Sequence, residues 1–141
     1  MKHAKWISVL MLLFVPLIAA AQLAPTERIV SQVPFKFAVG DVAMPAGEVT
    51  VQLADEKGWV LTVSNRDAKK AIFALAAATA AKKAAPESAL VFHKYGDRYF
   101  LVAMMIGDSR AVYEFRQSKL EKELLAQNLR ANEEILLASA R

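Results

Sequence analysis

Cysteine is missing from this chain of 141 residues, and histidine occurs only twice, as His3 and His93. Without cysteine, the protein forms no disulfide and carries no lipid anchor attached through cysteine. His93 alone gives no metal-ligand spacing, and we predict neither a metal site nor a cofactor. The five glycines form no glycine-rich phosphate loop. Stability must therefore come from a packed core, for which about 120 residues are sufficient.

An apolar run stands near the N-terminus. Two lysines precede the apolar region over residues 6–18, and the alanines at 19–21 satisfy the small-x-small rule for cleavage. This pattern predicts a secretory signal peptide over residues 1–21, cleaved before Gln22, and an exported protein that is periplasmic or extracellular. The alternative is a membrane anchor, although the run is shorter than the about 20 apolar residues of a transmembrane helix and Pro16 interrupts it.

Basic residues are only in small excess. The chain has 18 Lys and Arg, 14 Asp and Glu and a net charge of +4. Because Lys2 and Lys5 belong to the predicted signal peptide, the remaining chain has a net charge of +2. Charges of both signs are interspersed without a large basic face, which argues against nucleic acid as a partner. We expect contact with a membrane only through the signal peptide during export, and an unidentified protein or small molecule as the partner.

Alternation of apolar and polar residues with a period of two predicts a fold that is mainly β. Residues 22–28 are expected to form an exposed leader, and residues 29–116 a domain of about seven short strands. Its first strand covers residues 29–39, with Pro34 at an edge or at a strand start because proline cannot donate to a ladder. We predict an antiparallel meander, in the form of a curled sheet or a small barrel.

One hairpin is predicted early in this domain. Residues 48–53 alternate without interruption, and Asp55-Glu56-Lys57-Gly58 follows as a three-residue hairpin loop with glycine in the left-handed conformation. This loop sets Leu53 opposite Leu61, which keeps the apolar face continuous.

The strongest local signal is a central hairpin over residues 89–105. Two apolar runs flank Gly96-Asp97, a pair that is typical of a two-residue hairpin turn because glycine adopts a positive φ without steric cost. The turn determines the pairing of the two strands. It sets Tyr95 opposite Arg98, Lys94 opposite Tyr99, His93 opposite Phe100, Phe92 opposite Leu101, and Val91 opposite Val102.

The segment that precedes this hairpin allows two interpretations. We predict a strand over residues 69–76, followed by a loop that reaches Ser88. The alanines at 76–81 have a high helix propensity, however, so the alternative is an α+β fold with a second helix near residues 69–85.

A helix is predicted at the C-terminal end, over residues 117–141. Ser118 and Glu121 form a capping-box pattern, in which each side chain accepts a hydrogen bond from the other residue's backbone. Leucines at spacings of three and four continue the apolar stripe, so the helix is expected to reach Ala138 and to pack on the sheet.

Three motifs support a comparison at the level of a family. They are VPFxFxVG at residues 33–40, PAGE at residues 45–48 and LVFHxYGDRYFL at residues 90–101, and Ser118 with Glu121 adds a weaker match. Together they resemble a family of small exported proteins of acidobacterial-type soil bacteria, for which no activity is established. The resemblance implies the order and the boundaries of the elements from about residue 29 to 126, and it implies no chemistry.

The best candidate for a ligand site is the tip of the central hairpin, where aromatic and charged side chains gather. Aromatic rings beside a basic fork can hold sugars or anionic groups. The same side chains also stabilise a hairpin by cross-strand pairing, without any ligand. The candidate residues are His93, Lys94, Tyr95, Asp97, Arg98 and Tyr99.

No catalytic constellation is evident, so we expect a binding or envelope-associated domain that is not an enzyme. The first alternative is a carrier of a small ligand, in which side chains such as Phe35, Phe37 and Phe92 would line an apolar cavity inside a curled sheet. The second is a hydrolase, which would require His93, Asp97 and a serine or a second acid to converge.

Overall fold

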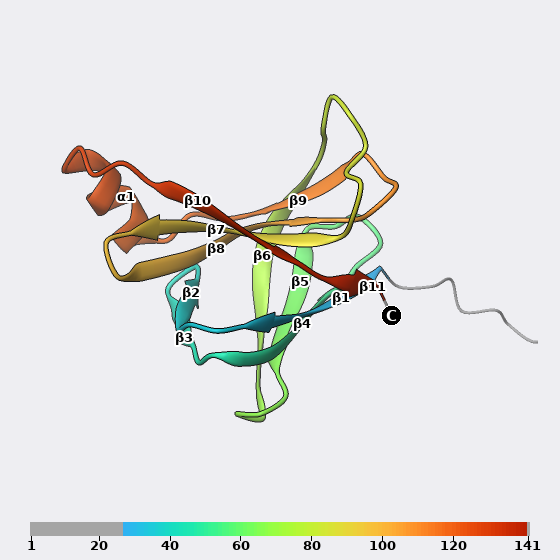
Figure 1. The fold of residues 1–141 in the computed structure, drawn as a ribbon, viewed down its shortest axis with the longest axis horizontal. Coiled ribbons are helices and arrows are strands. Elements are labelled where there is room, and N and C mark those ends of the chain that lie inside the picture. Colours follow the sequence, from blue (N-terminus) through green and yellow to red (C-terminus); the bar gives the residue numbers. More distant parts are fainter. Residues whose placement is uncertain (1–26, 141) are drawn as a thin grey trace, which may run out of the picture.

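Alternating apolar residues place most of the chain in strands. The computed structural model describes residues 27–140, so the predicted signal peptide over residues 1–21 lies outside the described residues. The fold is mainly β with one helix, as predicted (Figure 1). The elements of the described residues are β1 (Arg28–Val33), β2 (Phe37–Val39), β3 (Val42–Met44), β4 (Gly47–Leu53), β5 (Val60–Asn65), β6 (Lys70–Ala80), β7 (Ala89–Tyr95), β8 (Arg98–Met105), β9 (Ala111–Phe115), α1 (Lys119–Ala126), β10 (Asn132–Leu137) and β11 (Ser139–Ala140).

The strands form one mixed sheet of eleven members. Its main path runs β10-β7-β8-β9-β6-β5-β4-β1-β11, and the β2–β3 hairpin joins β8 beside this path. The prediction of about seven strands that are all antiparallel is therefore wrong. The β2–β8 pair is parallel, with Ala38 opposite Phe100, and the sheet is not closed, so the small-barrel form is also wrong.

Proline accounts for the first departure from the predicted strands. The strand expected over residues 29–39 is divided into β1 and β2, and Pro34 directly follows the last residue of β1. Because proline has no N–H to donate, the ladder between β1 and β4 stops there. The chain can then turn into the short β2–β3 hairpin, whose turn contains Gly40 with a φ of +56°.

The predicted hairpin between β4 and β5 is confirmed. Leu53 lies opposite Leu61 as expected. Asp55 organises the loop, because its Oδ1 accepts hydrogen bonds of 2.9 Å from the backbone N–H groups of Trp59 and Val60. Gly58 has the left-handed φ of +71° that the loop requires.

The ambiguous segment is a strand, so the second helix near residues 69–85 is wrong. β6 is longer than predicted and reaches Ala80. Its first half pairs with β5, and its second half pairs with β9 from Ala76 onward. Backbone pairing with β5 and β9 therefore outweighs the helix propensity of the alanines. Differences in helix propensity between ordinary residues are below about 1 kcal/mol per residue.

The C-terminal helix is much shorter than predicted. It ends at Ala126, where Gln127 is the C-cap and Asn128 takes a φ of +60°, a conformation that commonly ends helices. Ile135, Leu136 and Leu137 belong to β10, which pairs antiparallel with β7 along its whole length, whereas Leu129 lies between α1 and β10. The predicted helix to Ala138 is therefore wrong beyond its first two turns.

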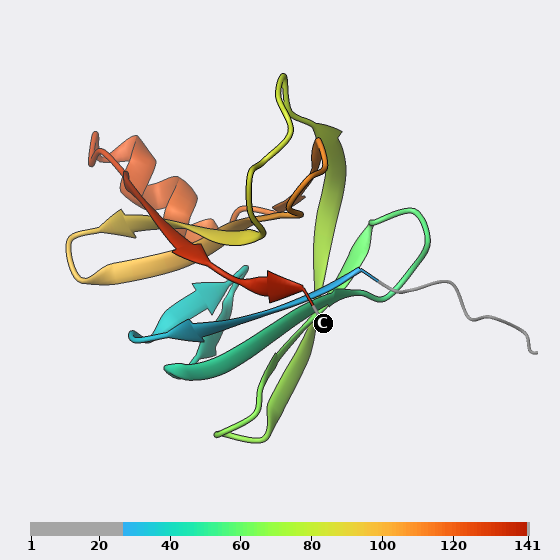
Figure 2. The same ribbon diagram turned by 45° about the vertical axis from the view of Figure 1, so that its right-hand side comes forward.

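The last strands of the described chain connect the two ends of the sheet. β10 pairs with β7, and β11 pairs with β1, only one residue further along the chain. Between them, the backbone N–H of Ala138 donates to Ser88 O at 2.8 Å, and Ser31 Oγ donates to Leu137 O at 2.9 Å. Figure 2 shows this segment, in red, crossing from one half of the sheet to the other.

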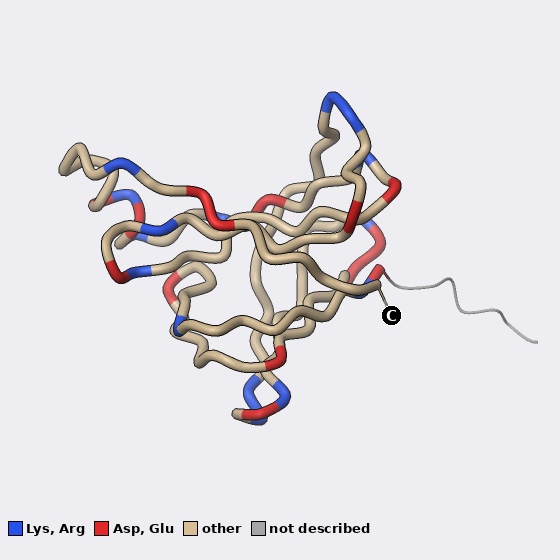
Figure 3. Tube along the Cα trace, in the orientation of Figure 1, with Lys and Arg blue, Asp and Glu red and all other residues tan. Residues whose placement is uncertain are grey.

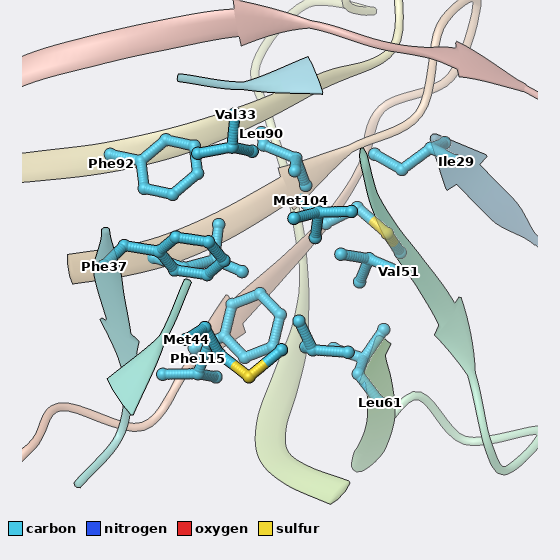
Figure 4. Packing of buried hydrophobic residues seen from close by; sticks show 14 of the residues in the cluster. Ile29, Val33, Phe37, Met44, Val51, Leu61, Leu90, Phe92, Met104 and Phe115 are labelled. Atoms are coloured by element: carbon cyan, nitrogen blue, oxygen red, sulfur yellow. The ribbon is translucent and has the colours of Figure 1, made fainter. Parts of the chain in front are cut away.

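Apolar side chains fill the space between the two halves of the curled sheet. Phe92 is fully buried in this core and forms a T-shaped pair with Phe37 at a centroid distance of 5.3 Å (Figure 4). Phe35 meets Phe92 from another side at 5.2 Å. The core cluster consists of Ile29, Val33, Phe37, Val39, Met44, Val49, Val51, Leu61, Val63, Leu90, Phe92, Leu101, Met104, Tyr113 and Phe115.

The burial of Phe92 gives a prediction for stability. We expect Phe92→Ala to lower the free energy of unfolding by about 3–5 kcal/mol, because it leaves a cavity in the core. Phe73→Ala should change it by less than about 0.5 kcal/mol, since Phe73 is 77% exposed. Urea denaturation of both variants measures the difference, and Phe92→Leu serves if the alanine variant does not fold. Equal losses for the two phenylalanines would contradict the described core.

Candidate functional site

The central hairpin has the predicted pairing near its turn. Tyr95 lies opposite Arg98, Lys94 opposite Tyr99 and His93 opposite Phe100. Gly96 has a φ of +60°, and Asp97 does not have a positive φ, which is the pattern of a type II′ turn with glycine first.

Further from the turn, the predicted pairing is wrong by one residue. Val91 lies opposite Ala103 instead of Val102, because the register shifts by one residue between Val91 and Phe92. The extra residue of this irregularity lies in β8 and exchanges the two faces of the strand. As a result, Met104 enters the core, and Ala103 lies on the opposite face together with Val91.

The six candidate residues are not assembled into one site. Since side chains alternate along a strand, the two faces of the hairpin separate Lys94 and Tyr99 from His93 and Tyr95. Asp97 and Arg98 are exposed at the turn. The structure therefore divides the cluster into two small groups and a solvent-exposed tip.

His93 and Tyr95 lie beneath the helix and contact a buried carboxylate. Glu121 is 2% exposed, and its Oε1 accepts a hydrogen bond of 3.2 Å from the Tyr95 hydroxyl. His93 Nδ1 lies 3.1 Å from the same oxygen. Ser118 Oγ accepts from the backbone N–H of Glu121 at 3.0 Å, which confirms one half of the predicted capping box. The carboxylate itself is directed to the hairpin, so Glu121 attaches α1 to β7.

This contact changes the ionisation of Tyr95. Burial raises the pKa of Tyr95 to about 12, and the charge of Glu121 and its hydrogen bond add to the effect. The hydroxyl therefore stays neutral and donates to the carboxylate over the whole physiological range of pH.

Lys94 and Tyr99 form the second group, on the core side of the hairpin. Lys94 Nζ lies 5.3 Å from the centroid of the Tyr99 ring, and the neighbouring Tyr99 hydroxyl raises the pKa of Lys94. The other side of the Tyr99 ring stacks on Phe35 at a centroid distance of 3.7 Å. This pair therefore covers one end of the apolar core, and a stacked ligand would have to displace a neighbour from the ring.

The geometry around His93 differs from the one a hydrolase needs. His93 contacts Glu121, whereas Asp97 lies in the exposed turn. Ser109 Oγ accepts from the backbone N–H of Ala111 at 3.0 Å, as expected for a turn residue. Within residues 27–140, no group of three or more His, Cys, Asp or Glu side chains is arranged to hold a metal ion.

A groove that we did not predict from the sequence lies between β3 and β6. It has a volume of about 480 Å³, and the β2–β3 turn, the middle of β6 and the start of α1 form its walls. Phe73 and Leu75 line it and are 77% and 55% exposed, which is unusual for large apolar side chains. We call it the β3–β6 groove. The strand predicted over residues 69–76 contains Phe73 and Leu75, but nothing in the sequence indicated their exposure, because residues 71–76 are all apolar.

The lining of the β3–β6 groove is positively charged. Arg116, Lys119 and Lys122 contribute three cations, and Asp41 is the one carboxylate among the lining residues. Asp41 Oδ1 accepts from the backbone N–H of Lys119 at 3.1 Å, so part of its charge is used to hold the start of α1. Elsewhere along the described trace, residues of both charge signs are interspersed (Figure 3). The groove thus combines an apolar floor with a net positive rim.

A second hollow of about 530 Å³ lies on the outer face of the hairpin, between β10 and β8. Its apolar lining includes Val91, Val102 and Ile135. His93 and two carboxylates, Glu114 and Glu133, also line it. It therefore carries negative charge and differs from the β3–β6 groove in the ligands it would attract.

Comparison of the chain with protein-family models, curated proteins and solved structures finds no match. Among residues 27–140, no helix is long and apolar enough to cross a membrane.

The buried carboxylate gives a prediction for the attachment of the helix. We expect Glu121→Ala to lower the free energy of unfolding by about 2 kcal/mol, because it leaves the buried Tyr95 hydroxyl without an acceptor. Glu123→Ala is the matched control, since Glu123 lies in the same helix and is exposed. Glu121→Gln should lose less than Glu121→Ala, because the amide oxygen still accepts from Tyr95. Equal effects of the Glu121→Ala and Glu123→Ala substitutions in urea denaturation would disprove this role.

The raised pKa of Tyr95 predicts a loss of stability at alkaline pH. The unfolded chain ionises this hydroxyl near its ordinary pKa of 10.0, whereas the folded protein keeps it neutral to about 12. Its contribution is therefore complete below pH 10 and disappears as the pH rises toward 12. Tyr113, whose pKa burial and Glu27 also raise to about 12, acts in the same direction.

In Tyr95→Phe, the free energy of unfolding should fall less steeply between these two pH values than in the parent protein. The difference in slope should be at most about 1.4 kcal/mol per pH unit. Denaturation curves recorded across this range measure it. Parallel profiles of the two proteins would show that Tyr95 is not neutral in the folded state.

Proposed function

We propose that this chain is an exported binding domain, not an enzyme, and that it binds its partner in the β3–β6 groove. Export is supported by the basic residues, the apolar run and the alanines of residues 1–21, which follow the order of a secretory signal. The resemblance to a family of small exported proteins agrees with this proposal.

One observation carries the choice of the groove. Phe73 and Leu75 expose their side chains on β6 beside the cations Arg116, Lys119 and Lys122. Exposed apolar side chains with a polar rim are typical of interaction sites, and the charges would orient an acidic partner. The hairpin residues favoured from the sequence support binding less well, because Tyr95 and Tyr99 already contact Glu121 and Phe35.

The carrier alternative is less well supported. It needs Phe37 and Phe92 to line a void, whereas these two rings contact each other in the core. A hydrolase is also less well supported, since the second acid it needs beside His93 is Glu121, which is 2% exposed and bonded to Tyr95.

Photo-crosslinking in the producing cells tests the proposal. A benzophenone amino acid in place of Phe73 should give a discrete adduct, identified by mass spectrometry, in the envelope fraction. The matched control replaces Trp59, which is 59% exposed and does not line the groove. The adduct at position 73 should decrease strongly when Lys122 is changed to glutamate. Equal adducts from both positions, or none from position 73, would refute the groove as the binding surface.

A further inference from the structure

We infer that the β3–β6 groove binds an extended acidic peptide segment, which adds to the edge of β6 as a further strand. This inference rests on the proposed function and specifies the partner of the same groove. It depends on the direction of the backbone groups of β6, on the opposite wall of the groove and on the charges at its end.

The first half of β6 has a strand on one side only. It pairs with β5, and its pairing with β9 begins at Ala76. The N–H of Ala76 donates to Trp59 O at 2.9 Å, in the direction of β5. Backbone groups alternate in direction along a strand of an antiparallel ladder. Ala71, Phe73 and Leu75 therefore direct their N–H and C=O groups away from β5, and Phe73 and Leu75 line the groove.

A hydrogen bond confirms this direction at one end. Leu75 O accepts from the backbone N–H of Arg116 at 3.0 Å, on the side away from β5. No strand of the described residues pairs with Ala71 and Phe73 on that side. Two donors and two acceptors are thus available in the order that a strand offers to a new neighbour, the arrangement used when an extended peptide adds to a sheet.

The opposite wall is the β2–β3 turn, which continues into β3. β3 pairs only with β2 among the described strands. Lys70 Nζ donates to Ala43 O at 2.6 Å, so its side chain spans the distance from the start of β6 to β3. Lys70 therefore joins the start of β6 to β3, and Arg116 joins Leu75 further along β6. Between these two contacts, no described strand pairs with β6 at Ala71 and Phe73 on the side away from β5.

The side chains and charges define the chemistry of the occupant. Phe73 and Leu75 lie on the exposed face of β6, so apolar side chains at alternate positions of an added strand would pack beside them. Arg116, Lys119 and Lys122 lie at the α1 end, where acidic side chains of the same segment would be attracted. An anionic amphiphile such as a fatty acid has apolar and acidic groups, as the peptide does. It has no peptide backbone, however, and so it cannot form hydrogen bonds with the N–H and C=O groups at the edge of β6.

Amide hydrogen exchange measured by NMR on the purified exported protein tests the inference. The probe is the peptide Thr-Val-Thr-Val-Thr-Val-Glu-Glu, blocked at its N-terminus. We expect it to slow exchange at the N–H groups of Ala71 and Phe73 by about tenfold or more, and not at Ile135 on the edge of β10. A version with alternate backbone nitrogens methylated should bind more weakly by at least about tenfold, since each lost hydrogen bond has roughly this effect.

Two variants separate the backbone from the charges. Ala71→Pro removes an N–H donor that points away from β5. It should therefore weaken the binding of the peptide and leave the fold intact. Lys122→Glu should also weaken the binding of the peptide. Lys57→Glu should leave the binding unchanged, because Lys57 does not line the groove. Retained circular dichroism and an unchanged urea midpoint show that each variant is folded.

Three outcomes would overturn the inference. Absence of any protection at Ala71 and Phe73, equal binding of the methylated peptide, or binding of dodecanoate in the groove without binding of the peptide would each exclude strand addition. A positive crosslink at position 73 together with any of these results would leave the groove as the binding surface and reject only the peptide. If no crosslink forms at position 73 but the peptide clearly protects the amides of Ala71 and Phe73, the result is different. The proposal of a partner in the envelope is then rejected, and the inference that the groove binds extended segments is kept.

Discussion

Pairing of one C-terminal segment with two distant strands is the constraint on which the shape of the sheet depends. β10 satisfies the outer edge of β7, and β11 satisfies the outer edge of β1, although β7 and β1 lie at opposite ends of the main sheet. Buried backbone groups must be hydrogen-bonded, so each of these pairings removes an otherwise costly edge. Because both are made by adjacent residues, the two halves of the sheet are held face to face around the core.

The sequence was sufficient where local chemistry decides the structure. Asp55 with Gly58, and Gly96 with Asp97, determine their turns, and the register follows from the turn for the nearest residue pairs. It was not sufficient where distant segments compete. The leucines after Asn128 suit a helix as well as a strand, and only the unpaired edge of β7 makes the strand more favourable. Likewise, the shift that moves Met104 into the core has no marker in an uninterrupted apolar run.

The candidate site shows the same division. Polar and aromatic residues at a hairpin tip suggest a ligand site in a sequence. In the structure, however, Tyr95 bonds to Glu121 of the helix and Tyr99 stacks on Phe35 over the core. The β3–β6 groove was hidden because its components, β3, β6 and α1, are far apart in the chain. The predicted strand over residues 69–76 includes Phe73. The exposure of Phe73, however, depends on which neighbouring strand β6 lacks, and only the topology of the sheet determines that.

The position of the closing segment has a consequence for how the chain acquires its structure. The hydrogen bond from Ser31 to Leu137 joins residues that are 106 positions apart, so the loop that it closes contains most of the described residues. Contacts of such long range slow folding. The outer edge of β1 therefore stays without a partner until Ser139 and Ala140 have joined it, which makes this edge one of the last to form. Until then, an unpaired edge of this kind can accept a strand from another chain, so the closing segment also protects the folding protein from association.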